Sequence, residues 1–140
     1  MASENAKLED LLWGAAEFLR GQIDASDYKQ YVFPLLFFKR LSDVYDDELE
    51  DAKKEMGTDD LFDYEHFHRF QISDEANWKT VKETTQDIGK AIQTALRTIE
   101  AKNERLAGVF GDAQWTNKER LPDHLLKDLI GHFSKIDLGL

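Results

Sequence analysis

The sequence Y-K-Q-Y-V-F-P-L-L-F-F-K-R-L-S-D, residues Tyr28–Asp43, opens the longest amphipathic pattern in this chain of 140 residues. Apolar side chains recur there at spacings of three and four, which is the periodicity of an α-helix, and this pattern predicts a helix as far as Met56–Gly57. Around residues 32–38 they surround the helix, so this segment is expected to be central to a bundle. Pro34 cannot donate a hydrogen bond to the Gln30 carbonyl and crowds it, which predicts either a kink or a helix that begins close by.

Helical periodicity also precedes this segment. Residues 8–19 carry apolar side chains at helical spacing, and Gly21 offers the positive φ that commonly ends a helix. Asp24 or Ser26 can cap the next helix, because a short side-chain oxygen accepts hydrogen bonds from its first amides. The apolar stripe of the first helix consists of Leu8, Leu11, Leu12, Ala15, Phe18 and Leu19.

The second half of the sequence predicts three further helices. A short helix is expected around Trp78–Thr84 with Asn77 or Thr80 as its cap, and a long one over about 88–103. The last helix is expected from about Pro122, since proline is favoured in a first helical turn. No alternating strand pattern holds for a useful length. The sequence therefore predicts an all-α fold, an irregular multi-helix bundle around one long central helix.

The connection between the long helix and the short one is unusually apolar. Residues 57–77 read as irregular, yet polar loops do not contain so many aromatic side chains. A structureless connection of about twenty residues is also uncommon in a compact domain. We therefore expect this stretch to pack against the bundle with a short helical turn, through Leu61, Phe62, Tyr64, Phe67, Phe70 and Ile72.

Negative charge is concentrated in one part of the chain. The sequence has 18 Lys and Arg against 28 Asp and Glu, a net charge of −10, and Asp43–Glu65 alone contains 11 acids and 2 bases. This segment is either a solvated helix end running into an acidic loop, or a surface for a basic partner or one that imitates DNA. Non-specific DNA binding by the isolated chain is disfavoured, because binding to phosphates requires an excess of Lys and Arg.

Composition excludes several classes of protein. Without cysteine the chain has no disulfide framework, thiolate zinc site or cysteine nucleophile. No apolar run reaches the roughly 18 residues of a membrane span, and the polar start resembles no secretory signal, so a cytoplasmic location is expected. The glycines form neither a dinucleotide-binding nor a P-loop motif. The residues thus predict no catalytic, cofactor-binding or metal-binding site.

Two kinds of metal site are suggested but incomplete. One pair of histidines would need a third ligand from elsewhere, and the other pair is spaced eight residues apart instead of four. A row of carboxylates could hold Mg²⁺ for a nucleotide hydrolase, but the third long helix lacks a matching pair. We interpret all of these as ordinary surface or half-buried side chains. The residues are His66 and His68, His124 and His132, and Glu48, Asp51 and Glu55.

Lys39 and Arg40 are an adjacent basic pair in the first half of the chain. They can be polar residues on the outer face of the helix that pair with Asp43, Asp46 or Asp47, three and four positions further on. Alternatively they contact phosphate or a partner. Lys39 and Arg40 are therefore our candidate residues for contact with DNA or a partner.

Several stretches closely resemble one known family. Leu8–Gly21 reads L-E-D-L-L-W-G-A-A-E-F-L-R-G, and Ile23–Asp43 reads I-D-A-S-D-Y-K-Q-Y-V-F-P-L-L-F-F-K-R-L-S-D. Both resemble the N-terminal helical domain of the modification subunit (HsdM) of type I restriction–modification systems. Further similar stretches follow in register: A-N-W at Ala76–Trp78, D-I-G-K-A-I at Asp87–Ile92, A-L-R-T-I-E at Ala95–Glu100 and R-L-P-D-H-L-L-K-D-L-I-G-H-F-S-K-I-D-L at Arg120–Leu138.

The resemblance implies a parent enzyme. The family's subunit is an S-adenosylmethionine-dependent adenine-N6 DNA methyltransferase that acts with a specificity subunit, and a restriction subunit can join them on double-stranded DNA. Its helical domain precedes a Rossmann-like catalytic domain with an N-P-P-[FY]-type motif for the flipped adenine. Here the only prolines are Pro34 and Pro122, and the cofactor glycine loop is absent. The family's catalytic and cofactor residues therefore map to no position in this sequence.

From the resemblance we expect residues 1–140 to be a single helical N-terminal domain, a non-catalytic fragment without its S-adenosylmethionine-binding domain. Its expected role is assembly of the complex and enclosure of DNA. The alternative is a stand-alone acidic helical binding protein, a DNA mimic or a regulator. It rests on the acidic segment Asp43–Glu65.

Overall fold

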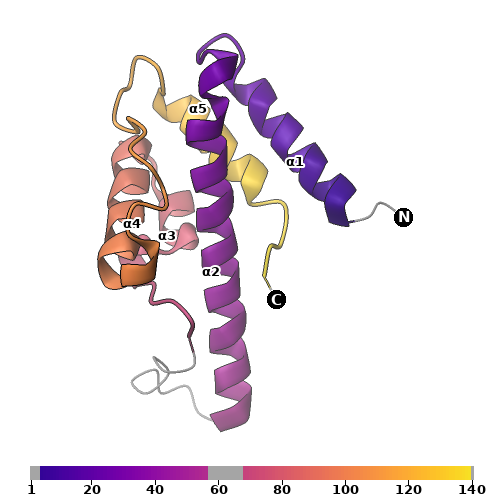
Figure 1. Cartoon of the computed structure of the whole chain (residues 1–140), viewed down its shortest axis with the longest axis vertical. Coiled ribbons are helices and arrows are strands. Elements are labelled where there is room, and N and C mark those ends of the chain that lie inside the picture. Colours follow the sequence, from indigo (N-terminus) through magenta and orange to yellow (C-terminus); the bar gives the residue numbers. More distant parts are fainter. Residues whose placement is uncertain (1–3, 57–67, 140) are drawn as a thin grey trace.

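The computed structural model describes residues 4–56 and 68–139, and this part of the chain is helical without any strand (Figure 1). The all-α prediction is therefore confirmed. The five α-helices are α1 (Glu4–Leu19), α2 (Tyr28–Met56), α3 (Trp78–Glu83), α4 (Ile88–Lys102) and α5 (Asp123–Phe133). Short 3-10 turns precede α2 at Ala25–Asp27 (η1), precede α3 at Asp74–Ala76 (η3) and follow α4 at Glu104–Leu106 (η4).

The long helix α2 runs through the middle of the molecule, with α3 and α4 on one side and α1 on the other (Figure 1). Its buried residues include Tyr31, Leu35 and Phe38, so its first half is the centre of the core, as predicted. Of the two outcomes expected at Pro34, a helix start at the proline is not observed, because α2 begins six residues before Pro34 and continues through it. The Gln30 carbonyl, which loses its amide partner, belongs to an exposed residue where water can solvate it.

The predicted helix ends and caps are confirmed. Gly21 has φ of 88° just after α1, a conformation that favours glycine because it has no Cβ. The Asp24 carboxylate accepts a hydrogen bond of 2.9 Å from the Ser26 amide at the start of η1. The Asn77 side chain accepts one of 2.9 Å from the Lys79 amide in the first turn of α3. These local contacts determine where α1 ends and where η1 and α3 begin.

Helices α4 and α5 are joined by an unusually close contact. A Cβ on Gly89 would lie 1.9 Å from the Trp115 carbonyl oxygen, so only glycine lets the loop between them reach α4. The Asp123 carboxylate, in the first turn of α5, accepts hydrogen bonds of 3.1 Å from the amides of both Asp87 and Ile88. One side chain of α5 thus caps the N-terminus of α4.

A buried polar link crosses the centre of the molecule. The Trp78 amide donates to the Ser42 hydroxyl of α2 at 3.1 Å, and the Trp78 indole N–H donates to the Ser134 hydroxyl at 2.9 Å. That hydroxyl donates to the Ile130 carbonyl at 2.6 Å. The indole ring also packs on Phe38, with 5.1 Å between ring centroids. Because buried polar groups are costly when unpaired, this link fixes α3 between α2 and α5.

The described part of the apolar connection packs against the bundle, as predicted. Ile72 is buried, Phe70 is half-buried, and η3 supplies a short helical turn. The buried Asn103 side chain accepts from the Gln71 amide at 2.7 Å and donates to the Gln71 carbonyl at 2.8 Å. The other apolar residues of the prediction, Leu61, Phe62, Tyr64 and Phe67, lie outside the described residues.

Within residues 4–56 and 68–139, no helix is long and apolar enough to cross a membrane.

Candidate functional site

Lys39 is buried beneath the C-terminal segment of the chain. Its side chain is 6% exposed and forms an ion pair with Asp43, one turn further along α2. Its ammonium also donates a hydrogen bond of 2.7 Å to the Ile136 carbonyl. The predicted pairing with Asp43 is confirmed, but Lys39 does not lie on an outer face, because residues 135–139 cover this turn of α2. Two acceptors compensate the ammonium for the water that it loses.

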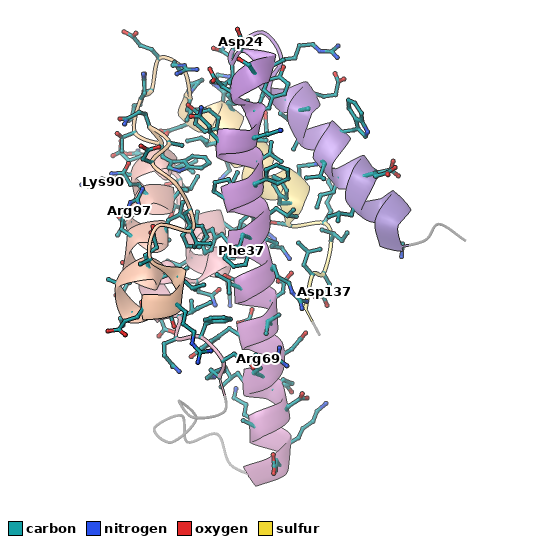
Figure 2. All side chains as sticks on the ribbon, viewed as in Figure 1. Asp24, Phe37, Arg69, Lys90, Arg97 and Asp137 are labelled. Atoms are coloured by element: carbon teal, nitrogen blue, oxygen red, sulfur yellow. The ribbon has the colours of Figure 1, made fainter. Side chains whose placement is uncertain are left out.

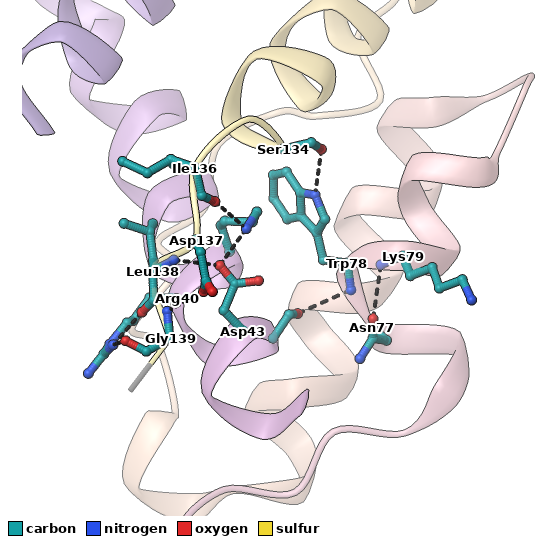
Figure 3. Close-up of polar contacts among 12 residues, drawn as sticks. Arg40, Asp43, Asn77, Trp78, Lys79, Ser134, Ile136, Asp137, Leu138 and Gly139 are labelled. Atoms are coloured by element: carbon teal, nitrogen blue, oxygen red, sulfur yellow. Dashed lines mark hydrogen bonds and ion pairs between the residues drawn. The ribbon is translucent and has the colours of Figure 1, made fainter. Parts of the chain in front are cut away.

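Arg40, which is exposed, also binds residues of the C-terminal segment (Figure 3). Its guanidinium donates to the carbonyl oxygens of Leu138 and Gly139, the second at 2.6 Å. Asp43 accepts a further hydrogen bond of 2.8 Å from the Leu138 amide. Lys39, Arg40 and Asp43 thus bind the backbone of residues 136–139 to α2. These contacts leave the predicted contact of Lys39 and Arg40 with DNA or a partner untested.

A groove of about 1060 Å³ lies beside this attachment, between α1, α2 and the C-terminal segment. Its apolar lining comes from all three elements, and Phe33 of α2 is 49% exposed there. Figure 1 shows the geometric reason: α1 diverges from α2 toward the N-terminus, and the C-terminal segment descends between them. The apolar lining residues are Leu8, Phe33, Leu36, Phe37, Ile136 and Leu138.

Positive charge predominates on the rim of this groove. Lys7, Arg40 and Lys135 line it against two carboxylates, Asp10 and Asp137. Among the described residues, none of the three cations forms an ion pair with another described residue. The groove therefore combines an apolar floor with a cationic rim in a chain whose net charge is −10.

Negative charge, in contrast, is concentrated on α2 beyond Asp43. Partial burial raises the pKa of the Asp46 carboxyl above its ordinary value, and the neighbouring charges of Asp43 and Asp47 raise this pKa further. A hydrogen bond of 3.3 Å from the Asn77 side chain partly offsets the effect. Negative charge thus accumulates on the second half of α2.

The predicted carboxylate row does not form a metal site. Within the described residues, no group of three or more His, Asp or Glu side chains could hold a metal ion. Glu48 instead contacts His68, with Oε1 3.3 Å from Nδ1, while Asp51 and Glu55 are exposed. The His68 ring is stacked on Tyr45, with 3.8 Å between ring centroids. His66 lies outside the described residues.

The other two histidines of the sequence analysis are separated in the fold. His124 is exposed. His132 packs against α1, where its Nε2–H donates to the Leu11 carbonyl at 2.8 Å. A Cβ on Gly14 would lie 2.4 Å from this ring, so the glycine lets the imidazole approach the helix. His132 therefore joins α5 to α1.

The family described as the HsdM N-terminal domain matches residues 8–133. The chain belongs to this family. The match covers all of α2 to α5 and most of α1, so the resemblance of the sequence to HsdM is confirmed. No curated protein matches the chain. In this HsdM N-terminal domain, one wall of the groove (residues 135–139) and Lys7 lie outside the matched range.

The sequence analysis missed the groove of this HsdM N-terminal domain. The apolar residues around 32–38 predict a central position for this part of α2, which the burial of Leu35 and Phe38 confirms, but they do not predict the 49% exposure of Phe33 at the groove. Leu36 and Phe37 are only half-buried. One sequence signal indicates such a groove. A helix that is apolar on every side needs neighbours on every side, and the apolar faces of the other helices are too few to cover it completely.

Proposed function

We propose that this chain is the N-terminal assembly and DNA-enclosing domain of a type I restriction–modification methyltransferase subunit, acting with a specificity subunit. The observation that carries the proposal is the family match over residues 8–133. In this proposal a restriction subunit can join the complex, which encloses double-stranded DNA in the cytoplasm. A catalytic domain that binds S-adenosylmethionine follows these residues in the parent subunit, and the present residues are non-catalytic.

Two features of the fold support a role in assembly. The segment 135–139 is attached to α2 through Lys39, Arg40 and Asp43, so whatever follows it starts from a fixed position. The groove beside it exposes apolar side chains, which in soluble proteins commonly mark interaction surfaces. The predicted contact of Lys39 and Arg40 with DNA or a partner belongs to this proposal. Of the two, the exposed Arg40 is the residue that can reach a ligand.

Reconstitution of a modification complex tests the proposal. Complexes with a specificity subunit are prepared with a modification subunit that contains these residues and with one that lacks them. We expect the shortened subunit to retain S-adenosylmethionine binding but to lose stable association with the specificity subunit and with duplex DNA. Equal assembly, DNA affinity and methylation by both complexes would overturn the proposal.

A stand-alone acidic binding protein is the second candidate. The acidic composition of the second half of α2 supports it: besides the larger effect of partial burial, the charges of Asp43 and Asp47 also raise the pKa of Asp46. For this function, changing Asp46, Asp47, Glu50 and Asp51 to their amides should abolish binding to a basic partner. Glu48 is kept because it contacts His68. Unchanged binding by the quadruple variant would exclude this candidate.

A further inference from the structure

The groove between α1, α2 and the C-terminal segment lies where one further helix could pack between α1 and α2. Helices α1 and α2 pack near their connection and then diverge, so the space between them widens toward the start of α1 (Figure 1). Asp137, on the C-terminal segment, lies in that space (Figure 2). Phe33, Leu36, Phe37 and Arg40 occupy spacings of three and four on α2, so they form one continuous wall.

The charges around this wall favour an acidic ligand. Lys7, Arg40 and Lys135 have no ion pair within the described residues, whereas Asp137 already accepts a hydrogen bond of 2.8 Å from the Gly139 amide. Toward the described residues, Arg40 donates two hydrogen bonds, both from its Nη1. A guanidinium has five N–H donors in total, so Arg40 can also pair with a carboxylate.

We propose that the groove binds one amphipathic helix of a protein partner, with apolar residues along one face and Asp or Glu on its flanks. Such a helix places side chains at i, i+3, i+4 and i+7 against the apolar wall. Its acidic flanks meet Lys7, Arg40 and Lys135. This inference rests on the proposed function and specifies the chemistry of one partner in the assembly. Two of the three cations, Lys7 and Lys135, lie outside the family match.

DNA fits the same groove less well. Phosphate oxygens gain nothing from an apolar floor that includes the 49% exposed Phe33, and burial of that floor is the larger available contribution to binding. Duplex DNA is therefore the competing outcome of the experiment.

Titration of the isotope-labelled 140-residue chain with synthetic peptides tests the inference by NMR. The probe is an amphipathic peptide of about five helical turns, with Leu at i, i+3, i+4 and i+7 and Glu on both flanks. A second peptide carries Lys in place of each Glu, and a third has the first composition in scrambled order. We expect the Glu peptide to shift the amides of Phe33, Arg40 and Ile136, with roughly tenfold weaker binding of the other two.

Two surface variants assign the binding to the groove. Phe33→Ser removes the exposed ring of the floor and should weaken binding of the Glu peptide roughly tenfold. Trp13→Ala is the matched control, because Trp13 is an aromatic residue of α1 that is 73% exposed and does not line the groove. Its affinity for the peptide should not change. Circular dichroism of both variants verifies that the fold is retained.

Three results would overturn the inference: no shift of the groove amides, equal binding of the Glu and Lys peptides, or unchanged affinity of Phe33→Ser. Stronger perturbation of the same amides by duplex DNA would assign the groove to DNA. If the peptide does not bind but assembly of the modification complex requires these residues, the helix-binding site is rejected and the proposed function stands. If the peptide binds but the complex assembles equally well without these residues, the helix-binding site stands and the proposed function is rejected.

Discussion

The two sides of α2 differ in how completely they are filled. On the closed side, which consists of α3, α4, the loop 103–122 and α5, the backbone of one element touches the next and a carboxylate caps a neighbouring helix. On the open side, which consists of the first half of α1 and residues 135–139, a groove of about 1060 Å³ remains. Both sides are rich in apolar residues. Small residues and placed caps, rather than hydrophobicity, therefore decide where the bundle closes.

The largest expected effect tests the tightest contact of the closed side. Gly89→Ala would place a Cβ 1.9 Å from the Trp115 carbonyl oxygen, and backbone cannot move aside as a side chain can. We expect a loss of about 3 kcal/mol or more in the free energy of unfolding, measured by urea denaturation.

Gly131→Ala is the control for this substitution. Gly131 is also helical, in α5, but a Cβ there would meet nothing within 4 Å. Alanine should therefore stabilise the domain by roughly 0.5–1 kcal/mol through helix propensity. Equal effects of the two substitutions would show that the approach of the loop to α4 is not a constraint.

The buried cation of the open side should have the next largest effect. Lys39→Met keeps most of the side-chain volume but leaves Asp43 without its ion-pair partner, at a site where the lysine is 6% exposed. We expect a loss of roughly 2–3 kcal/mol in the free energy of unfolding, since removal of one partner strands the other charge.

Arg40→Met removes the neighbouring, exposed cation and should cost about 1 kcal/mol or less. Urea denaturation of both methionine variants compares their free energies of unfolding. The difference between them separates the effect of burying a cation from the effect of its charge alone. If both cost the same, the position of Lys39 under residues 135–139 contributes nothing special.

The cap between α5 and α4 should contribute about 1 kcal/mol. Asp123→Ala leaves the amides of Asp87 and Ile88 without their acceptor, at the N-terminus of α4. Hydrogen exchange of the Ile88 amide should accelerate more than that of α1 amides. Asp128→Ala, at an exposed position of the same helix, is the control and should leave the exchange of Ile88 unchanged.

The smallest expected effect concerns pH. The pKa of Asp46 is raised above its ordinary value of 3.8, so the fold favours the protonated carboxyl. This contribution is complete below the unfolded pKa and is lost as the pH rises through the folded pKa. Asp46→Asn should therefore be more stable than the original chain at pH 7, by only a few tenths of a kcal/mol, because solvent still reaches this partly buried carboxyl and screens its charge.

Urea denaturation at pH 7 and at pH 3 measures this difference, which should disappear at the lower pH. A stabilisation of Asp46→Asn that persists unchanged at pH 3 would exclude the ionisation of Asp46 as its cause.

Local features of the fold could be predicted from the sequence. Which side of α2 is closed by packing and which is left open could not. Helices α1, α4 and α5 follow from apolar spacing, and Gly21, Asp24 and Asn77 act as caps within a few residues of their partners. The interaction of Asp123 with the Ile88 amide joins residues 35 apart, and no periodicity encodes such a pair.

The candidate site was predictable only in part. The Lys39–Asp43 pair follows from helical spacing. The burial of Lys39 does not, because it depends on a carbonyl far along the chain. The exposure of Phe33 depends on the angle between α1 and α2, which side-chain volumes set and sequence patterns do not record.

The hydrogen bond from Lys39 to Ile136 also has a consequence during protein synthesis. Its two residues are 97 positions apart, and ribosomes add about 5–20 residues per second. Roughly 5 to 20 seconds therefore separate the appearance of the ammonium from that of this acceptor. In that interval the ammonium of Lys39 has Asp43 but lacks its second acceptor, the Ile136 carbonyl. Elongation, rather than the speed of helix formation, thus sets the earliest time at which residues 135–139 can attach to α2.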